Sequence, residues 1–231
     1  MHASPRKLVI AIDGPAGAGK STVAAHLARK FGYVNLESGA MYRALALAAI
    51  ESNADRTSEA ALVDLARTLK IELIPTSEGN RVILNGRDVS TRIRERDVTE
   101  SASVVSVFPK VRERMVHLQR QLGANGGVIM EGRDIGTVVF PNADIKIFLD
   151  ADQDVRANRR LAQVNANDPE QAAKLVRDLQ ERDQRDKSRS SSPLVAAPDA
   201  IHIDSSRLNL DQVIAEIERI VTARLANATA F

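Results

Sequence analysis

Residues 8–21 read LVIAIDGPAGAGKS, and this stretch decides the fold. Residues 8–12 form a continuous apolar run, which is typical of a strand buried on both faces of a sheet. After Asp13, residues 14–21 match the pattern G-x-x-x-x-G-K-[ST] of a phosphate-binding loop. Such a loop works only where a strand leads into it and a helix follows it.

A helix is expected directly after the loop. Val23, Leu27 and Phe31 recur at helical spacing, and Gly32 is suited to end the helix. The glycines of the loop let the backbone wind tightly and turn its N–H groups inward, while the helix N-terminus adds a positive dipole. Together these features predict an anion-binding site.

We expect the phosphates of a bound nucleotide to lie along this loop, at Gly14, Pro15, Ala16, Gly17, Ala18, Gly19, Lys20, Ser21 and Thr22. The side chain of Lys20 should reach the terminal phosphates, and the Ser21 hydroxyl should bind Mg²⁺. The alternative is a glycine-rich turn whose lysine is only solvated.

Length and composition limit the class of protein. With 231 residues, of which 44% are apolar and 3% aromatic, the chain fits one α/β domain with insertions and an aliphatic core. A net charge of +2 is too balanced to indicate nucleic acid, and the lack of cysteine excludes disulfides and thiolate metal sites. No apolar run reaches membrane-spanning length, and the N-terminus lacks the apolar core of a signal peptide. We therefore expect a cytoplasmic protein with neither membrane nor nucleic-acid partners. We also expect a monomer, although composition does not determine the oligomeric state.

Strand and helix patterns alternate along the chain. Further strands are expected at residues 33–36, 128–130, 145–149 and 200–203. Helices are expected up to about residue 52, from Ser58 to 70, from Pro109 to 122, from Asp152, from Asp168 to 189 and from Asn209. This alternation predicts a parallel sheet flanked on both faces by helices, with ligands beyond the carboxyl ends of its strands. The loop and residues 37–43 and 131–134 should converge there.

Residues 54–99 interrupt the alternation. Short strands are expected at 71–74 and 82–84, and Asn85-Gly86 is a strong two-residue hairpin signal. We interpret this segment as an insert in a core formed by residues 1–53, 100–154 and 190–231. The alternative is a surface excursion without function.

Residues 155–189 carry many arginines. On a helix, Arg182, Asp186 and Arg189 share a face, because they are spaced i, i+4 and i+7. Beside a phosphate-binding loop, such a segment is expected to be a mobile lid that excludes water and adds positive charge when it closes. The alternative is a solvated face of salt bridges.

The pattern favours one class of nucleotide-using protein. The chain has no N-K-x-D motif for reading a guanine base, and none of its histidines pairs with a carboxylate in the sequence as a general base would. A phosphorylated acceptor needs no base, since its second pKa of about 6 leaves its oxygens anionic at neutral pH. Phosphoryl transfer then requires positioning and charge neutralisation, for which Arg43, Arg112 and Arg133 are candidates. A kinase acting on a phosphorylated acceptor fits best.

Several segments resemble bacterial cytidylate kinases. They are residues 14–22 (GPAGAGKST), 37–43 (ESGAMYR), 131–137 (EGRDIGT), 146–151 (KIFLDA) and 182–186 (RDQRD) with Arg189. The resemblance spans nearly the whole chain in order. It implies a P-loop nucleoside monophosphate kinase fold, with residues 54–99 as a monophosphate-binding subdomain and residues 155–189 as a helical lid. It also implies transfer of the γ-phosphoryl group of ATP to CMP or dCMP with Mg²⁺.

The resemblance implies roles for individual residues. The acceptor phosphate would be held by Ser38, Arg43 and Arg133. The cytosine would be read by Ser103, Arg112 and Asp134. The ribose would be held by Arg182 and Asp186, with Arg189 near the phosphates. Catalytic roles would fall to Lys20, Arg133, Arg182 and Arg189. Glu37 departs from the family pattern, in which many members carry Asp, so the geometry of that turn stays open.

Two other functions stay open at this point. Another nucleobase or a small alcohol could be the acceptor of the phosphoryl group. Alternatively, the chain could be an ATP-gated RNA-binding module that uses its arginines as a basic patch. That second function predicts a steep salt dependence of RNA binding and no ADP formation with CMP.

Overall fold

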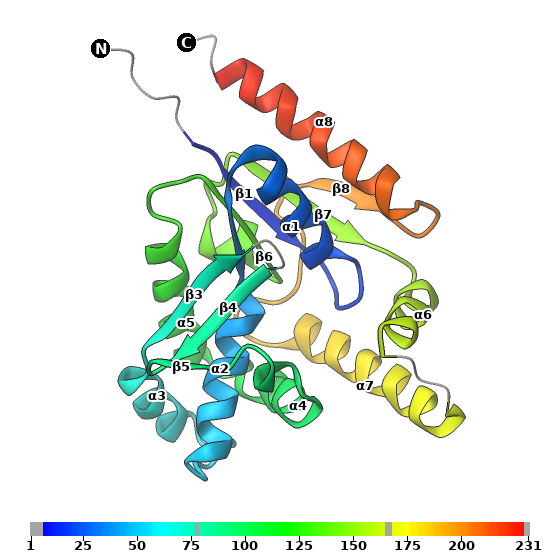
Figure 1. The fold of residues 1–231 in the computed structure, drawn as a ribbon. Helices are drawn as coiled ribbons and strands as arrows, with labels where there is room; N and C mark the ends of the chain where they lie inside the picture. The colour runs from blue at the N-terminus through cyan, green and yellow to red at the C-terminus, as the bar shows by residue number, and fades with distance from the viewer. Residues whose placement is uncertain (1–6, 77–78, 165–167, 229–231) are drawn as a thin grey trace.

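The computed structural model describes residues 7–76, 79–164 and 168–228. Its central sheet has five parallel strands in the order β2-β6-β1-β7-β8 (Figure 1). Their bounds are β1 (Val9–Asp13), β2 (Val34–Glu37), β6 (Val128–Gly132), β7 (Ile145–Asp150) and β8 (Ile201–Asp204). The predicted parallel α/β sheet is confirmed.

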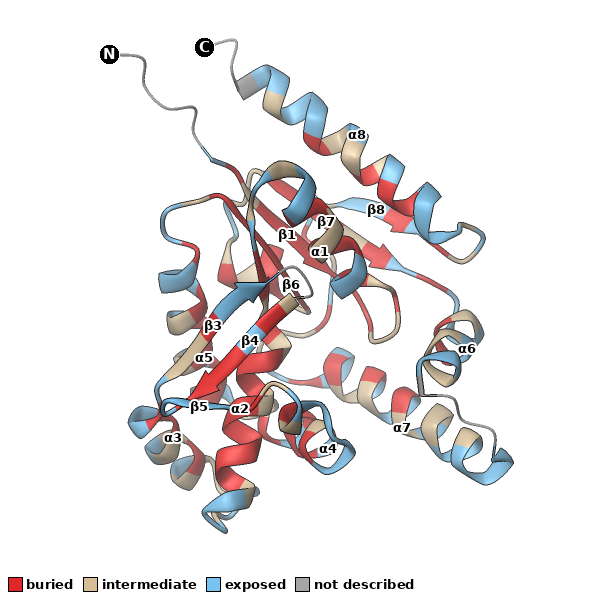
Figure 2. Cartoon of the chain, in the orientation of Figure 1, coloured by how far each residue is buried: buried red, intermediate tan, exposed pale blue. Residues whose placement is uncertain are grey.

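Helices cover both faces of this sheet. One face packs against α1 (Lys20–Phe31) and α8 (Leu210–Ala228), and the other against α2 (Ser38–Glu51) and α5 (Pro109–Leu122). The side chains of β1 alternate between them, so that Ile10 and Ile12 join the first cluster and Ala11 the second. Figure 2 shows α2 as buried over most of its length. A strand buried on both faces explains the unbroken apolar run.

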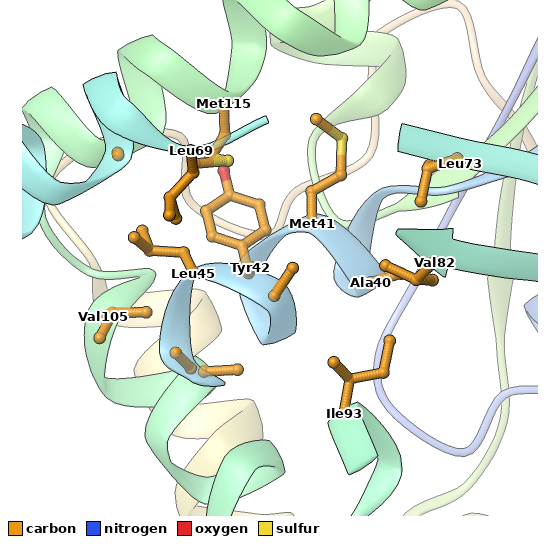
Figure 3. Packing of buried hydrophobic residues seen from close by; sticks show 14 of the residues in the cluster. Ala40, Met41, Tyr42, Leu45, Leu69, Leu73, Val82, Ile93, Val105 and Met115 are labelled. Carbon is orange, nitrogen blue, oxygen red and sulfur yellow. The ribbon is translucent and has the colours of Figure 1, made fainter. Parts of the chain in front are cut away.

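A second, antiparallel sheet lies within residues 54–99. It consists of β3 (Ile71–Thr76), β4 (Gly79–Leu84) and β5 (Arg87–Asp88), and α3 (Glu59–Thr68) precedes it. Asn85 and Gly86 have φ angles of 49° and 84°, the left-handed values that a two-residue hairpin turn needs. Leu73 and Val82 pack with Met41 of α2 in one hydrophobic cluster (Figure 3). The small sheet therefore shares its core with the main sheet.

A helix that the sequence analysis did not predict follows this sheet. After a short turn, η1 (Arg92–Arg94), the chain forms α4 (Arg96–Val105), so the proposed boundary at residue 99 falls inside a helix. Val98, Ala102 and Val105 are buried, and their i, i+4, i+7 spacing was the available signal. This helix packs against α2 and lines the functional cleft described below.

Local signals placed several helix ends correctly. The Ser58 hydroxyl accepts the N–H of Ala61 at 3.3 Å, and the Asp168 carboxylate caps α7 (Pro169–Ser188). Asn209 caps α8, since its side-chain oxygen accepts the N–H of Gln212 at 2.9 Å. Within the described ranges, no helix combines the length and apolarity that crossing a membrane requires.

Two further elements complete the surroundings of the site. A π-helical turn, η2 (Ile135–Val139), follows β6, and α6 (Gln153–Val164) follows β7. In Figure 1, α6 and α7 lie to one side of the sheet.

Candidate active site

The phosphate-binding loop joins β1 to α1. Gly17 and Gly19 have φ angles of 79° and 96°, which only glycine adopts without strain. Gly14 approaches β7 so closely that a Cβ atom there would lie 1.9 Å from the carbonyl oxygen of Leu149. Conformation and close contact therefore both require the glycines of the motif.

Lys20 lies buried at the start of α1. Its Nζ donates to the carbonyl oxygen of Pro15 at 2.6 Å, so the ammonium group folds back over the loop. Burial, reinforced by the nearby charge of Arg133, lowers the pKa of Lys20 to about 7. A phosphate placed on the loop would favour the charged form of this lysine.

Ser21 and Glu131 meet at the carboxyl end of the sheet. The Ser21 hydroxyl donates to Glu131 Oε1 at 3.0 Å, and Glu131 is itself buried on β6. The sequence analysis placed Glu131 in a motif but assigned it no role. The available signal for Glu131 was an acidic residue at the end of β6, the strand next to β1. This position places a carboxylate oxygen beside the Ser21 hydroxyl.

Asp13 ties the end of β1 to the turn after β6. Its carboxylate accepts the backbone N–H groups of Ile135 and Gly136 at 2.8 and 2.7 Å. Burial outweighs these hydrogen bonds and raises the pKa of Asp13 to about 6. The contact fixes the backbone directly after Asp134.

A buried pocket lies around Arg112 of α5. Its guanidinium donates to Asp134 and to the carbonyl oxygen of Ser106, the latter at 3.1 Å, and stands 5.5 Å from the centroid of the Tyr42 ring. Among the described residues, the Arg112 Nε and the Ser103 hydroxyl are buried without a hydrogen-bond partner. The pocket therefore offers unused polar groups to a ligand.

Ser38 and Arg43 lie at the start of α2. The Ser38 hydroxyl donates to the carbonyl oxygen of Glu131 at 2.7 Å, and Arg43 donates to the carboxylate of Glu37. Arg94 approaches the same carboxylate at 3.5 Å. Although burial acts in the opposite direction, the charges of Arg43 and Arg94 hold the pKa of Glu37 below its usual value. Glu37 thus serves as the counter-charge of both arginines.

One face of α7 closes over these groups. Arg133 Nε donates to Asp186 Oδ2 at 2.8 Å, and Arg189 Nη1 lies 3.4 Å from the other oxygen of Asp186. Arg182 has no ion pair with any residue in the described part of the chain. Burial, with Arg133 nearby, lowers the pKa of Arg182 to about 10. An anion between Arg182 and Arg133 would relieve this repulsion.

All of these segments line one cleft of about 720 Å³. The predicted residues that line it are Ala16, Gly17, Ala18, Gly19, Lys20, Ser21, Thr22, Ser38, Arg43, Ser103, Arg112, Arg133, Asp134, Arg182, Asp186 and Arg189. Gly14 and Pro15 lie outside the lining, where Gly14 contacts β7 and Pro15 accepts from Lys20.

The cleft also contains residues that the sequence analysis did not assign to it. They are Glu37, Tyr42, Arg94, Glu131, Arg159, Arg160, Gln163, Ser205, Leu208 and Val213. Glu37, Tyr42 and Glu131 lie within segments that resemble the family, whereas packing between distant segments brings the others to the cleft and no local motif marks them. With an anion cradle at one end and arginine–carboxylate pairs at the other, the cleft can hold two anionic ligands with cations between them.

Comparisons with known proteins identify the family of this chain. A crystal structure of an uncharacterized protein from Eubacterium ventriosum shares the fold, with a TM-score of 0.50 at 14% identity over 94% of this chain and 99% of that one. The chain is 44% identical to the cytidylate kinase of Solibacter usitatus, over 98% of this chain and 97% of the relative. It is 48% identical to that of Proteus mirabilis, over 89% and 92%. The sequence profile described as cytidylate kinase matches residues 10–223, so this chain belongs to the cytidylate kinase family.

Proposed function

We propose that this chain transfers the γ-phosphoryl group of ATP to CMP or dCMP, which yields ADP and CDP or dCDP. The observation that carries the proposal is the convergence of the phosphate-binding loop and the pocket of Ser103, Arg112 and Asp134 on one cleft. Family membership supports the same reaction. Because the acceptor phosphate is already anionic, the site has to orient it and neutralise charge rather than remove a proton.

Four cations would stabilise the transferring group, namely Lys20, Arg133, Arg182 and Arg189. All four line the cleft, and the pKa values of Lys20 and Arg182 are lowered while no phosphate is present. Preorganised charge of this kind favours the transition state, because no solvent has to reorganise during the reaction. The acceptor phosphate would bind to Ser38, Arg43 and Arg133, and the ribose to Arg182 and Asp186.

Mg²⁺ would be held by the Ser21 hydroxyl and the Glu131 carboxylate together with phosphate oxygens. Two adjacent oxygen ligands suit this cation, which usually binds proteins through one or two carboxylates and completes its shell with phosphates and water. When bound, it neutralises charge on the terminal phosphates of ATP.

The pocket chemistry favours cytosine. Cytosine presents an amino donor, which complements a carboxylate. Its ring nitrogen and carbonyl are acceptors, which complement an arginine. Uracil reverses the first two positions, so Asp134 and Arg112 would each face a like group. Unpaired polar groups in a buried site can discriminate by factors on the order of ten thousand.

We further propose a division into a core (residues 1–53, 100–154 and 190–231), an acceptor-binding insert (54–99) and a lid (155–189). The lining of the cleft supports it, since Arg94 and Thr99 of the insert and Arg182 and Asp186 of the lid reach the same cleft as the loop of the core. We also propose that the chain acts as a monomer. Because its substrates are free nucleotides, we place the chain in the cytoplasm, without membrane or nucleic-acid partners.

The test is a steady-state assay of ADP formation with CMP, dCMP, UMP, AMP, GMP and a small alcohol such as shikimate. We expect CMP and dCMP to be preferred by at least about a hundredfold in kcat/KM. A preference for another acceptor would overturn the substrate assignment. Salt-dependent RNA binding without ADP formation would favour the RNA-binding alternative instead.

A further inference from the structure

A buried ion pair between α6 and α7 has no part in the proposed chemistry. Arg156 and Asp183 are only 5% and 7% exposed, and the Arg156 guanidinium donates to the Asp183 carboxylate. Removing two charges from water is costly, and apolar residues of similar size often serve a core equally well. Stability alone therefore does not account for a charged pair at this position.

Both partners also contact the backbone of the phosphate-binding loop. Asp183 Oδ1 accepts the N–H of Ala16 at 3.4 Å, and Arg156 Nη1 donates to the carbonyl oxygen of Ala16 at 3.0 Å. Arg156 is held in turn by the carbonyl oxygen of Ala151 at 2.9 Å. At Gly17, a Cβ atom would lie 3.1 Å from Arg156 Cβ, so α6 lies directly against the loop. The pair therefore binds both backbone polar groups of one loop residue, the N–H and the carbonyl oxygen of Ala16.

The position of Asp183 on α7 gives this contact with the loop a consequence for the cleft. Asp183 and Asp186 are spaced i, i+3, so they lie on neighbouring turns of one face. Asp186 binds Arg133 at the acceptor pocket, whereas Asp183 binds the loop. Arg182, which lines the cleft, is the residue next to Asp183. The depth at which Arg182 enters the cleft therefore depends on how α7 rests on the loop.

We propose that Arg156 and Asp183 are positioning residues that dock α7 on the phosphate-binding loop and so set the placement of Arg182 against the bound triphosphate. This inference rests on the proposed function. The two residues act through the loop and through Arg182, and they do not touch the reacting atoms. The docking contact belongs to the ATP side of the cleft, so its loss affects ATP more than CMP.

The experiment compares two variants with a matched control. Asp183→Asn leaves Arg156 without its counter-charge, while the double variant Arg156→Met/Asp183→Leu replaces the pair by apolar side chains that preserve packing. Asp178→Asn is the control, because Asp178 lies on the same helix and binds the exposed Arg96 at 2.6 Å, away from the loop. Each protein is assayed for its melting temperature, kcat, the KM for CMP, and the Kd for ATP measured by calorimetry without acceptor.

We expect the double variant to melt within a few degrees of the wild type, yet to lose about tenfold or more in kcat and several-fold in ATP affinity. The KM for CMP should rise by a smaller factor than the Kd for ATP, because Asp186 on the same helix keeps its own contact with Arg133. The control should match the wild type in every measurement. Asp183→Asn should show the same kinetic pattern where it folds.

Wild-type kcat and ATP affinity in a stably folded double variant would overturn the proposal. So would failure of both variants to fold, since the pair would then be a stability element. If the wild type binds ATP but does not phosphorylate CMP, the proposed function fails instead, and the ATP affinities of the variants still decide the role of the pair.

Discussion

The two ends of the cleft are built in different ways. The loop end is one continuous stretch, residues 14–22, that presents backbone N–H groups and a helix terminus. The acceptor end is assembled from side chains of α2, α4, α5, β6 and α7. Its cations are already engaged without a ligand, as in the pairs Arg112–Asp134 and Arg133–Asp186.

This difference separates affinity for phosphate from selectivity. A ligand at the loop end binds to backbone N–H groups that can bind any polyphosphate. The loop therefore discriminates little between nucleobases. A ligand at the acceptor end must satisfy polar groups that the protein already pairs with one another, so a mismatched base leaves buried groups unpaired. Charge neutralisation should therefore depend on the loop end, and substrate choice on the acceptor end.

The largest effect is expected at Lys20. Lys20→Ala removes a buried cation from the transferring phosphoryl group, and we expect kcat to fall by about 100- to 1,000-fold while CMP binding survives. Lys30→Ala is the control, because Lys30 lies on the same helix and pairs with Glu218 at the surface. Steady-state kinetics and CMP calorimetry measure both effects. Near-normal turnover of Lys20→Ala would remove the loop from the mechanism.

The next largest effect should appear at Asp134 and concern selectivity. In Asp134→Asn, an amide N–H₂ can face the uracil carbonyl, so the CMP preference over UMP should narrow by about tenfold to a hundredfold in kcat/KM. Loss of a buried counter-charge also costs about 3–5 kcal/mol of folding free energy, so a thermal melt accompanies the assay. Asp64→Asn, at an exposed position, should leave the ratio unchanged. An unaltered ratio in Asp134→Asn would take base reading away from this residue.

The pH dependence should distinguish the two ends directly. The pKa of Lys20 is lowered to about 7 in the free protein, and bound phosphate favours its charged form, so ATP binding above pH 7 must take up a proton. We expect ATP affinity to fall by as much as about tenfold per unit between pH 7 and 9, whereas CMP affinity, which depends on arginines, stays level. Calorimetry in buffers of different ionisation enthalpy measures the proton uptake. ATP affinity that is constant over this range would contradict the prediction.

The smallest effect is expected in the dynamics of the lid. If α7 closes on bound substrates, amide exchange across Pro169–Ser188 should slow several-fold when a bisubstrate analogue binds. The later turns of α8, where Ile217 and Val221 are buried in the core, provide an internal reference. Exchange in α7 that does not respond to the analogue would favour a static, solvated face of salt bridges.

Whether the sequence predicts a feature depends on how far apart in the chain the residues that determine it lie. The loop and the caps at Ser58, Asp168 and Asn209 depend on neighbours in the chain, so the sequence predicts them. The π-helical turn after β6 is held by Asp13, more than a hundred residues earlier, and no local pattern marks it.

The acceptor pocket shows the same limit. Ser103, Arg112 and Asp134 reach one cleft only because α4, α5 and β6 pack together, and only the family resemblance suggested their association. Their pairing has no local signature, because the sequence does not distinguish a buried, paired arginine from an exposed one. Arg156 likewise pairs with Asp183, 27 residues later in the chain, and no local pattern marks this pair.

Helix α7 carries Asp183 and Asp186 on adjacent turns. Asp183 binds the loop end of the cleft, and Asp186 binds Arg133 at the acceptor end. A rigid helix cannot rest fully on one of these contacts while it is lifted from the other. An occupant at the loop end that favours the docked helix must therefore raise the affinity at the acceptor end, and linkage demands the same factor in reverse. Cooperativity between two unlike substrates thus arises within one chain, because a single helix responds to both.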